Sequence, residues 1–360
     1  MPRAVGKNDR VQTERIRMAE TTTTTRRTAP RDQEAGAVNS VRRIDIVMPV
    51  YNDWDSFCQL AHGLDTAVSD WGHSVRILAV DDGSLDEGNG LVTDLRDLEH
   101  IEEIRVHRLV SNLGHQRAIA VGLSEVCREN SSDAVIVMDS DGEDRPEDVR
   151  ALRDAFMQDP HRIVVAQRAR RSEGPLFRLF YRIYRLAFVV LTGRNIDFGN
   201  FMLIPGKFIE PVTHSGWIWN HLASGIVRMR FPIRAVPTER GTRYAGESKM
   251  NPVSLIVHGF SAMSVFSDTV FVRVLLVSLV LSVGTAVGIL MVVLIRLLTE
   301  MAIPGWATNA VGLLFVIFLQ ALLLSAGAAV LLLATRSQQT VVPALDSERH
   351  VRSRTTVFSR

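Results

Sequence analysis

The sequence AVIVMDSDGE occupies residues 134–143 and joins five apolar residues directly to an acidic segment. A short and wholly apolar run is typical of a strand that is buried on both faces of a parallel sheet. Comparable runs occupy residues 44–50 (IDIVMPV), 75–80 (VRILAV), 104–109 and 163–166. Helix-like segments separate these runs, and strands that alternate with helices favour right-handed βαβ units. The sequence therefore predicts an α/β domain with a Rossmann-like, mostly parallel sheet.

Acidic residues follow two of the predicted strands at the point where each strand ends. The segment Asp81–Ser84 (DDGS) comes directly after the strand at 75–80, and Asp139 follows the strand at 134–138. Parallel sheets bind ligands at the carboxyl ends of their strands, so both segments would meet at one edge. Carboxylates there can accept hydrogen bonds from nucleobase N–H groups or ribose hydroxyls. For the first segment, an ordinary Asp-Gly-Ser turn is the alternative.

The second acidic segment carries three carboxylates at alternate positions. In extended backbone such residues project to one side, so Asp139, Asp141 and Glu143 would converge on one point. Three unpaired carboxylates repel one another, and a divalent hard cation resolves that repulsion. A solvated acidic turn is the alternative. An EF-hand is excluded because Arg150 stands where its loop needs a bidentate Glu. An aspartyl phosphatase is excluded because its DxDG pattern is followed by Thr or Val, whereas this chain has Glu143 at that position.

Composition limits the remaining classes of function. The chain has 360 residues, a net charge of +2 and 46% hydrophobic residues, which suggests a charged globular part joined to a strongly apolar part. Its two cysteines exclude a disulfide scaffold and a cysteine-rich zinc module. Residues 1–43 carry ten Lys and Arg against five Asp and Glu, with little apolar periodicity. We expect a disordered basic tail there and no nucleic-acid-binding domain.

Two long apolar segments near the C-terminus predict a pair of membrane-spanning helices. Residues 274–295 contain no formal charge over 22 residues, and residues 310–334 contain none over 25. As helices rising about 1.5 Å per residue, both exceed the roughly 30 Å thickness of a hydrocarbon core, although buried soluble helices are the alternative. The loop 297–309 carries no Lys or Arg, whereas basic residues flank both segments on their other side. The positive-inside rule therefore predicts an inner-membrane protein with its globular domain and both termini in the cytoplasm.

Two further segments are expected to lie along the membrane surface. In LFRLFYRIYRLAFVVL, residues 176–191, Arg178, Arg182 and Arg185 fall on one helical face and apolar residues fill the rest. Such a helix suits the bilayer interface with its guanidinium groups toward phosphates, and a packed helix with snorkelling arginines is the alternative. The second segment is the apolar stretch 252–268, which precedes the first predicted span.

Taken together and in this order, the motifs resemble those of a family 2 glycosyltransferase of GT-A fold. They are MPVYN at 48–52, VDDGS at 80–84, SNLGHQRA at 111–118, VMDSDGEDRPE at 137–147 and RYAGESKM at 243–250. Two apolar spans follow them. In particular, the chain is similar to the polyisoprenyl-phosphate glycosyltransferases, the group of dolichol-phosphate mannose synthase and its bacterial two-span relatives. The resemblance covers residues 44–334.

The resemblance implies roles for the residues that match the family's motifs. The nucleotide-binding residues would be Pro49, Tyr51, Asp53, Asp81, Asp82, Asn112 and Gly114. The ligands of Mg²⁺ or Mn²⁺ would be Asp139, Asp141 and Glu143, and the catalytic residues would be Asp139, Asp141 and Arg243. The contacts to a lipid phosphate would come from Arg168, Arg178, Arg182, Ser248 and Lys249.

Several positions depart from the family's pattern. Asp53 stands where the family usually has Glu, and Glu143 stands where it more often has Gln, which makes the expected metal site more anionic. Asn200 and Met202 replace the Asp and Arg of a frequent GDFRL motif, and Arg182 replaces a position that can be Ser.

The activity that the resemblance implies is transfer of a sugar from a UDP- or GDP-linked donor to polyprenyl phosphate at the cytoplasmic membrane face. The product would be a lipid-linked sugar donor for modification of cell-envelope glycans. A phosphate monoester has a second pKa of about 6, so it is largely dianionic near neutral pH and needs no general base. Direct displacement would invert the anomeric carbon, while metal and cationic groups neutralise the departing nucleoside diphosphate.

Two other activities stay open on the sequence alone. A glycosyltransferase acting on a lipid hydroxyl, such as a glyceride or ceramide, would need a general base with a tuned pKa. A catalytically inactive membrane scaffold is disfavoured because both acidic segments and RYAGESKM are retained. A processive polysaccharide synthase is disfavoured because the chain contains no QxxRW.

The expected organisation has five parts. They are a disordered basic tail (1–43), a GT-A domain (44–250), a juxtamembrane interfacial helix (251–269), two transmembrane helices (270–335) and a cytoplasmic tail (336–360). The expected partners are the nucleotide-sugar, the polyprenyl phosphate and the bilayer, with no nucleic acid. Bacterial relatives also suggest a homo-oligomer formed through the spans.

Overall fold

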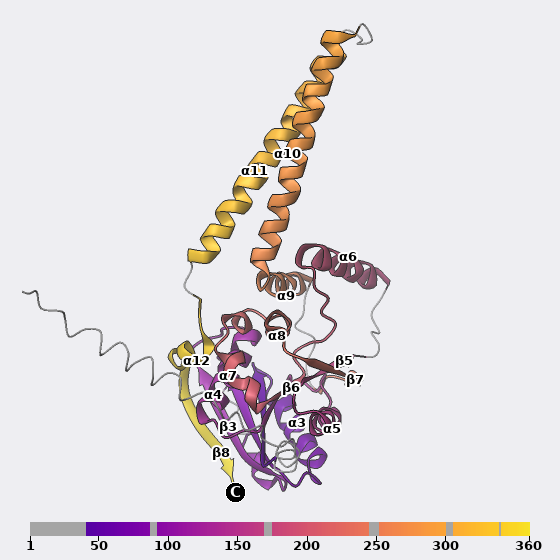
Figure 1. Ribbon diagram of the computed structural model, residues 1–360. Helices are drawn as coiled ribbons and strands as arrows, with labels where there is room; N and C mark the ends of the chain where they lie inside the picture. Colours follow the sequence, from indigo (N-terminus) through magenta and orange to yellow (C-terminus); the bar gives the residue numbers. More distant parts are fainter. Residues whose placement is uncertain (1–40, 87–91, 169–174, 245–251, 300–304, 338–339) are drawn as a thin grey trace, which may run out of the picture. The chain divides into compact units, whose positions relative to one another are not determined.

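The computed structural model of the chain describes residues 41–86, 92–168, 175–244, 252–299, 305–337 and 340–360 (Figure 1). The predicted disordered tail lies outside the described residues up to residue 40. Residues 42–360 form one compact unit.

The described residues form an eight-stranded sheet with the order β7-β5-β6-β4-β1-β2-β3-β8. Its strands are β1 (Arg43–Val50), β2 (Ser74–Asp81), β3 (Ile101–Leu109), β4 (Ala134–Val137), β5 (Ile163–Arg168), β6 (Met202–Pro205), β7 (Ile233–Thr238) and β8 (Val351–Ser359). β1 pairs in parallel with β2 and β4, and β3 and β7 pair in parallel with β2 and β5. Only β6 and β8 are antiparallel to their neighbours in this sheet. The predicted α/β class with a mostly parallel sheet is confirmed.

Helices connect and cover these strands. In the globular part they are α3 (Trp54–Ala67), α4 (His115–Glu129), α5 (Asp148–Gln158), α6 (Pro175–Thr192), α7 (Gly206–Thr213) and α8 (Leu222–Met229), with shorter 3₁₀ turns η2 (Val92–Asp97) and η3 (Gly216–Trp219). α4 packs directly on the sheet, because a Cβ at Gly122 would lie only 2.5 Å from Val47 and 2.8 Å from Val80. The sheet therefore fixes the position of α4, including His115 at its start.

Three further helices follow the globular part. α9 (Pro252–Ser264) leads into α10 (Ser267–Leu298), and α10 lies beside α11 (Trp306–Ser337) (Figure 1). Both α10 and α11 are long and apolar enough to cross a membrane, and they contain the predicted spans 274–295 and 310–334. Only 17% and 11% of their most apolar stretches are buried, so these are not core helices of the globular part.

The chain beyond α11 returns to the sheet. It forms α12 (Pro343–Asp346), the 3₁₀ turn η4 (Ser347–His350) and then β8, which pairs antiparallel with β3. Figure 1 shows β8, in yellow, along the edge of the sheet. The expected tail at 336–360 therefore contains a strand of the sheet that the sequence pattern does not predict.

Candidate active site

The predicted residues of the two acidic segments, together with Pro49 and Tyr51, lie at or just after the carboxyl ends of β4, β1 and β2, which are neighbours in the sheet. Val50 at the end of β1 is in register with Asp81 at the end of β2. The carbonyl of Pro49 accepts a hydrogen bond of 2.8 Å from the Ser140 hydroxyl, which joins β1 to the acidic turn after β4. Tyr51 follows β1 and is 40% exposed. The expected meeting of both acidic segments at one sheet edge is therefore present.

The loop after β2 is held by its own carboxylates. Asp82 is buried, and its two carboxylate oxygens accept the N–H groups of Leu113 (2.7 Å) and Gly114 (2.9 Å). Burial raises the pKa of Asp82, and these two hydrogen bonds oppose that rise. Asp81 accepts the N–H of Ser84 at 2.8 Å. In this structure Asp82 thus fixes the loop that precedes α4.

The close contact between the loop after β2 and the loop before α4 requires a glycine at position 83. Gly83 has a φ of +75°, and a Cβ there would lie 2.7 Å from the backbone nitrogen of Asn112. A side chain at this position would separate the two loops, because both the left-handed backbone and the close contact exclude it. Gly83 therefore lets Asn112 and Gly114, two of the predicted nucleotide-binding residues, lie against the end of β2.

The acidic turn after β4 differs from the prediction. β4 ends at Val137, the following residues form a bend rather than a strand, and Gly142 has a φ of +85°. Alternate residues of a bend do not share one side, so the argument that placed Asp139, Asp141 and Glu143 on one point does not apply. Among the residues that the structure describes, no three His, Cys, Asp or Glu side chains are grouped so that they could hold a metal ion.

Each of the three carboxylates instead faces a basic side chain. Asp139 Oδ1 lies 3.2 Å from Nε2 of His115. Asp141 Oδ2 lies 3.5 Å from Arg243. Both oxygens of Glu143 accept from Arg240, at 2.6 and 2.7 Å. The predicted place of Glu143 in a three-carboxylate site is therefore not found, because Arg240 engages both of its oxygens.

Asp139 and Asp141 still fit a divalent cation. Burial raises the pKa of Asp141, and the negative charges of Asp139 and Glu143 raise it further, which shows that negative charge accumulates at this turn. Mg²⁺ in nucleotide sites is commonly held by one or two carboxylates together with substrate phosphates. Two carboxylates from this turn therefore suffice for an ion that a diphosphate also ligates.

The segment Glu239–Tyr244 is docked on the acidic turn by its backbone. The N–H of Gly241 donates to the carbonyl of Glu143 (2.9 Å), and the N–H of Tyr244 donates to the carbonyl of Asp141 (3.1 Å). The Tyr244 ring lies so close that a Cβ on Gly142 would be 2.5 Å from it. The turn and this segment therefore form one unit.

Arg243 connects this unit to the nucleotide-binding side. Its Nη2 donates to Asp53 Oδ2 at 2.5 Å, while Nη1 faces Asp141. Asp53 also accepts from the Ser56 hydroxyl at 2.7 Å, at the start of α3. The structure thus brings together Asp53, Asp141 and Arg243, three residues that the sequence analysis had assigned to one site.

His115 also lies in the site, although the family motifs assigned it no role. Its Nε2 contacts Asp139 and lies 3.1 Å from Nδ2 of Asn200. Burial lowers the pKa of His115, but the charge and hydrogen bond of Asp139 outweigh that effect and raise it above its ordinary value. The sequence signal for this role of His115 is its position in SNLGHQRA, directly after a predicted strand and loop.

The residues assigned to a lipid phosphate are only partly described. Arg182 is exposed on α6. Arg168 ends β5 and Arg178 lies in α6, but their side chains are not among the described ones. Ser248 and Lys249 lie outside the described residues.

Comparison with known proteins defines the class of this site. Residues 45–209 match the domain described as Glycosyl transferase family 2. This range contains β2, β4, the acidic turn and all of β1 except its first two residues. The chain therefore carries a family 2 glycosyltransferase domain, and the glycosyltransferase predicted from the motifs is confirmed.

Curated relatives extend the likeness beyond this domain. Two undecaprenyl-phosphate 4-deoxy-4-formamido-L-arabinose transferases, from Klebsiella pneumoniae strains 342 and ATCC 700721 / MGH 78578, are each 27% identical to this chain over 287 residues. Each alignment covers 77% of this chain and 83% of the relative.

Solved structures show a more distant likeness. Mannosyl-3-phosphoglycerate synthase from Rubrobacter xylanophilus is 18% identical with a TM-score of 0.46, covering 65% of this chain and 74% of that one. Glucosyl-3-phosphoglycerate synthase from Mycobacterium tuberculosis, in complex with Mn²⁺, UDP and glucosyl-3-phosphoglycerate, is 17% identical with a TM-score of 0.43, covering 69% and 86%.

Proposed function

We propose that this protein transfers a sugar from a nucleotide-sugar to a polyprenyl phosphate in the cytoplasmic leaflet, with inversion and with Mg²⁺ or Mn²⁺. The observation that carries the proposal is the closeness of α9, the helix before the apolar pair, to the acidic turn. On α9, Nε2 of His258 lies 3.2 Å from Nε2 of His221. The next residue, Leu222, donates its N–H to Gln116 beside His115, and His115 in turn contacts Asp139 at 3.2 Å. Burial lowers the pKa of His258, and the charges of His115 and Asp139 both act on that pKa. A helix at the membrane surface thus borders the carboxylates that would face the donor.

The C-terminal strand supports the proposed topology. β8 follows α11 and pairs with β3 of the catalytic sheet, so the chain lies on the same side before α10 and after α11. Two crossings by α10 and α11 satisfy this constraint, whereas one crossing does not. Together with the distribution of basic residues, this favours a cytoplasmic domain with both termini on the same side.

Apolar side chains on α6 and α9 support contact with the bilayer. Leu186 and Val190 of α6 are 66% and 61% exposed, and Phe260 of α9 is 65% exposed. Large apolar groups beside a membrane-spanning pair favour burial among lipid chains. The exposed guanidinium of Arg182 on α6 suits phosphate groups at the same level.

The chemistry of a phosphate acceptor fits the residues of the site. The dianion is itself a nucleophile, so the protein needs to align it and to accept charge on the departing diphosphate. Asp139 and Asp141 would hold the metal ion, which when bound supplies positive charge to that diphosphate. His115 and Arg243 orient these two carboxylates. The curated relatives named as undecaprenyl-phosphate transferases support the same class of acceptor.

An acceptor assay tests the proposal. Full-length protein is incubated with labelled nucleotide-sugars and with undecaprenyl phosphate, diacylglycerol or ceramide, and the chloroform-soluble product is identified by mass spectrometry. We expect a sugar linked to undecaprenyl phosphate, formed only with added divalent metal. A sugar on diacylglycerol or ceramide, or no lipid product with any donor, would refute the proposal.

Glu143→Gln tests whether this residue is a metal ligand. Because Arg240 engages Glu143, we expect the transfer rate to fall by no more than about fivefold, which corresponds to the loss of roughly 1 kcal/mol from a weakened ion pair. The metal concentration that gives half-maximal rate should not change. A rise in that concentration, measured by titrating Mn²⁺ and Mg²⁺ into the assay, would instead identify Glu143 as a ligand.

A further inference from the structure

The short helix α8 contacts both α4, which begins at His115, and α9, the helix before the apolar pair. It packs against α4 in the globular part and against α9 beyond it (Figure 1). Its own residues include none of the predicted site residues. The contacts at its two ends nevertheless connect the site to the membrane side of the protein.

The first turn of α8 joins the start of α4 to α9. The N–H of Leu222 donates to Oε1 of Gln116 at 2.8 Å, and Gln116 is the neighbour of His115. His221 caps the helix, because its Nδ1 accepts the N–H of Ser224 at 3.2 Å. A neutral imidazole that accepts at Nδ1 carries its proton on Nε2, and this nitrogen lies 3.2 Å from Nε2 of His258 on α9.

The two imidazoles are held as a neutral pair. His221 is buried, and burial, followed by the charges of His258 and His115, lowers its pKa to about 3. Burial also lowers the pKa of His258. A neutral pair with one proton between its nitrogens makes a directional contact rather than a repulsive one.

The last turn of α8 makes the second contact. Arg228 donates to Asp268 Oδ2 at 2.7 Å, in the first turn of α10, and also to the carbonyl of Val265. Its guanidinium lies over the Trp217 ring, 4.5 Å from the centroid. The side chain is only 20% exposed, so this ion pair is partly shielded from solvent.

Two separate contacts restrain the movement of α9 and α10 more than a single contact would. His258 and Asp268 lie ten residues apart, one in α9 and one in α10, and opposite ends of α8 contact them. A single contact would let α9 and α10 pivot against the catalytic domain. A second contact, together with the buried cluster of Phe188, Val265 and Phe266, removes that freedom.

We propose that α8 is a two-point clamp that sets the height of the catalytic site above the bilayer, with Arg228 and His258 as positioning residues. The inference rests on the proposed function, since only an acceptor held in a membrane makes this height matter. The phosphate of such a lipid stays near the headgroup level, and the donor must be brought to it. A misplacement of about 1 Å can cost roughly a hundredfold in rate.

The test compares a membrane-held acceptor with a soluble one. Full-length wild type, Arg228→Gln, Arg228→Lys and His258→Ala are placed in lipid nanodiscs and assayed with undecaprenyl phosphate and with short-chain geranyl phosphate. For Arg228→Gln and His258→Ala we expect roughly a tenfold loss of kcat/KM with undecaprenyl phosphate and less than about twofold with geranyl phosphate. The KM for the donor should stay unchanged, and Arg228→Lys should restore most of the activity.

Hydrogen exchange provides a readout that does not depend on activity. Arg228→Gln should speed amide exchange in α9 and the first turn of α10 while β1 and β2 stay protected. Arg162→Gln is the control for removal of an arginine, because Arg162 forms a more exposed ion pair with Asp159 (2.9 Å) on the globular part.

Either of two results would overturn the clamp. One is an equal loss of activity with both acceptors, and the other is unchanged exchange in α9. If wild type used neither acceptor, the proposed function would fall, and the exchange measurement would still decide whether α8 restrains α9.

Discussion

Replacing Asp139 or Asp141 by Asn is expected to reduce sugar transfer by about a hundred- to a thousandfold while the protein stays folded. Either change removes one negative charge from the turn that would hold the divalent cation. The donor's diphosphate would then depart with less of its charge neutralised. Steady-state transfer to undecaprenyl phosphate, measured across metal concentrations, checks this expectation.

The geometry predicts that these variants fold normally. Asn keeps a carbonyl oxygen at position 141 that can still accept the Glu143 N–H, now bonded at 3.0 Å to Asp141 Oδ1. At position 139 the amide can still pair with His115. The loss should therefore appear in catalysis and in metal affinity, and thermal unfolding should be close to that of wild type.

Asp70→Asn serves as the matched control for these two substitutions. Asp70 is an exposed carboxylate that pairs with Arg150 at 2.7 Å, away from the sheet edge that carries the site. Its removal should leave transfer within about twofold of wild type, because exposed ion pairs contribute little. Full activity in Asp139→Asn and Asp141→Asn would show that the turn does not serve the donor.

The sequence predicted the sheet edge that carries the site because the relevant rules are local. Apolar runs such as 44–50 and 134–138 can be buried only as central strands, and residues directly after parallel strands must meet at one edge. The structure places Pro49, Asp81 and Asp139 accordingly. The family motifs then gave the glycosyltransferase class.

The arrangement of side chains within the acidic turn was not predictable in the same way. The positive φ of Gly142 bends the chain and separates carboxylates that a period of two would align. The partner of Glu143, Arg240, lies 97 residues further along the chain. Likewise, His115 meets Asn200 across 85 residues. Because such pairings form only in the completed fold, no local sequence pattern predicts them.

The strand β8 was not predicted for a related reason. Most of its residues are exposed, and two arginines interrupt it, so it lacks the apolar alternation of a half-buried strand. Its partner β3 lies more than 240 residues earlier in the chain. Only the return of the chain after α11 brings the two strands together.

Deleting residues 351–360 is expected to lower the midpoint of thermal unfolding by about 10 °C and to promote aggregation. The deletion strips the outer strand from β3 and exposes a new sheet edge. It also removes Arg354 from Glu125, a carboxylate whose side chain is only 5% exposed. Loss of the Arg354 contact costs about 1–3 kcal/mol, and loss of the strand pairing brings the total to roughly 3–5 kcal/mol. Each kcal/mol lowers the midpoint by about 2–4 °C in a large domain.

Glu125 shows why the C-terminal strand belongs to the folded domain. Arg354 donates to it at 2.9 and 3.2 Å, and His107 and Arg128 contact the same carboxylate. Burial alone would raise the pKa of Glu125, but the close contacts of His107, Arg354 and Arg128 hold it well below its ordinary value. This stabilisation is complete above the ordinary pKa of a glutamate and is lost only as the pH falls toward the depressed value.

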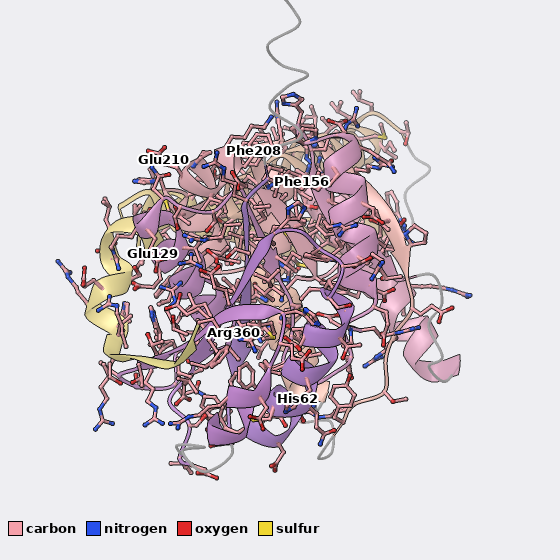
Figure 2. The ribbon with its side chains drawn as sticks, turned by 90° about the horizontal axis from the view of Figure 1, so that it is seen from below. His62, Glu129, Phe156, Phe208, Glu210 and Arg360 are labelled. Carbon is pink, nitrogen blue, oxygen red and sulfur yellow. The ribbon has the colours of Figure 1, made fainter. Side chains whose placement is uncertain are left out.

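The end of the strand is anchored as well. The Arg360 N–H donates to the carbonyl of Glu102 (3.0 Å), and its Nη1 donates to that of Glu99 (2.6 Å). Figure 2 labels Arg360 on the face seen from below. Contacts at both Arg354 and Arg360 indicate that the strand is held along its length.

Two point variants separate the buried ion pair from the strand itself. Arg354→Gln should lower the free energy of unfolding by about 1–3 kcal/mol, and the unfolding midpoint by less than the deletion does. The effect is smaller because His107 and Arg128 still contact Glu125. Arg352→Gln, at an exposed neighbour in the same strand, should change stability by less than about 0.5 kcal/mol. Intrinsic fluorescence during heating of the detergent-solubilised full chain measures all three variants. A truncated protein that melts with wild type and keeps its activity would show that β8 contributes nothing to the catalytic sheet, and the argument for two crossings by α10 and α11 would lose its structural support.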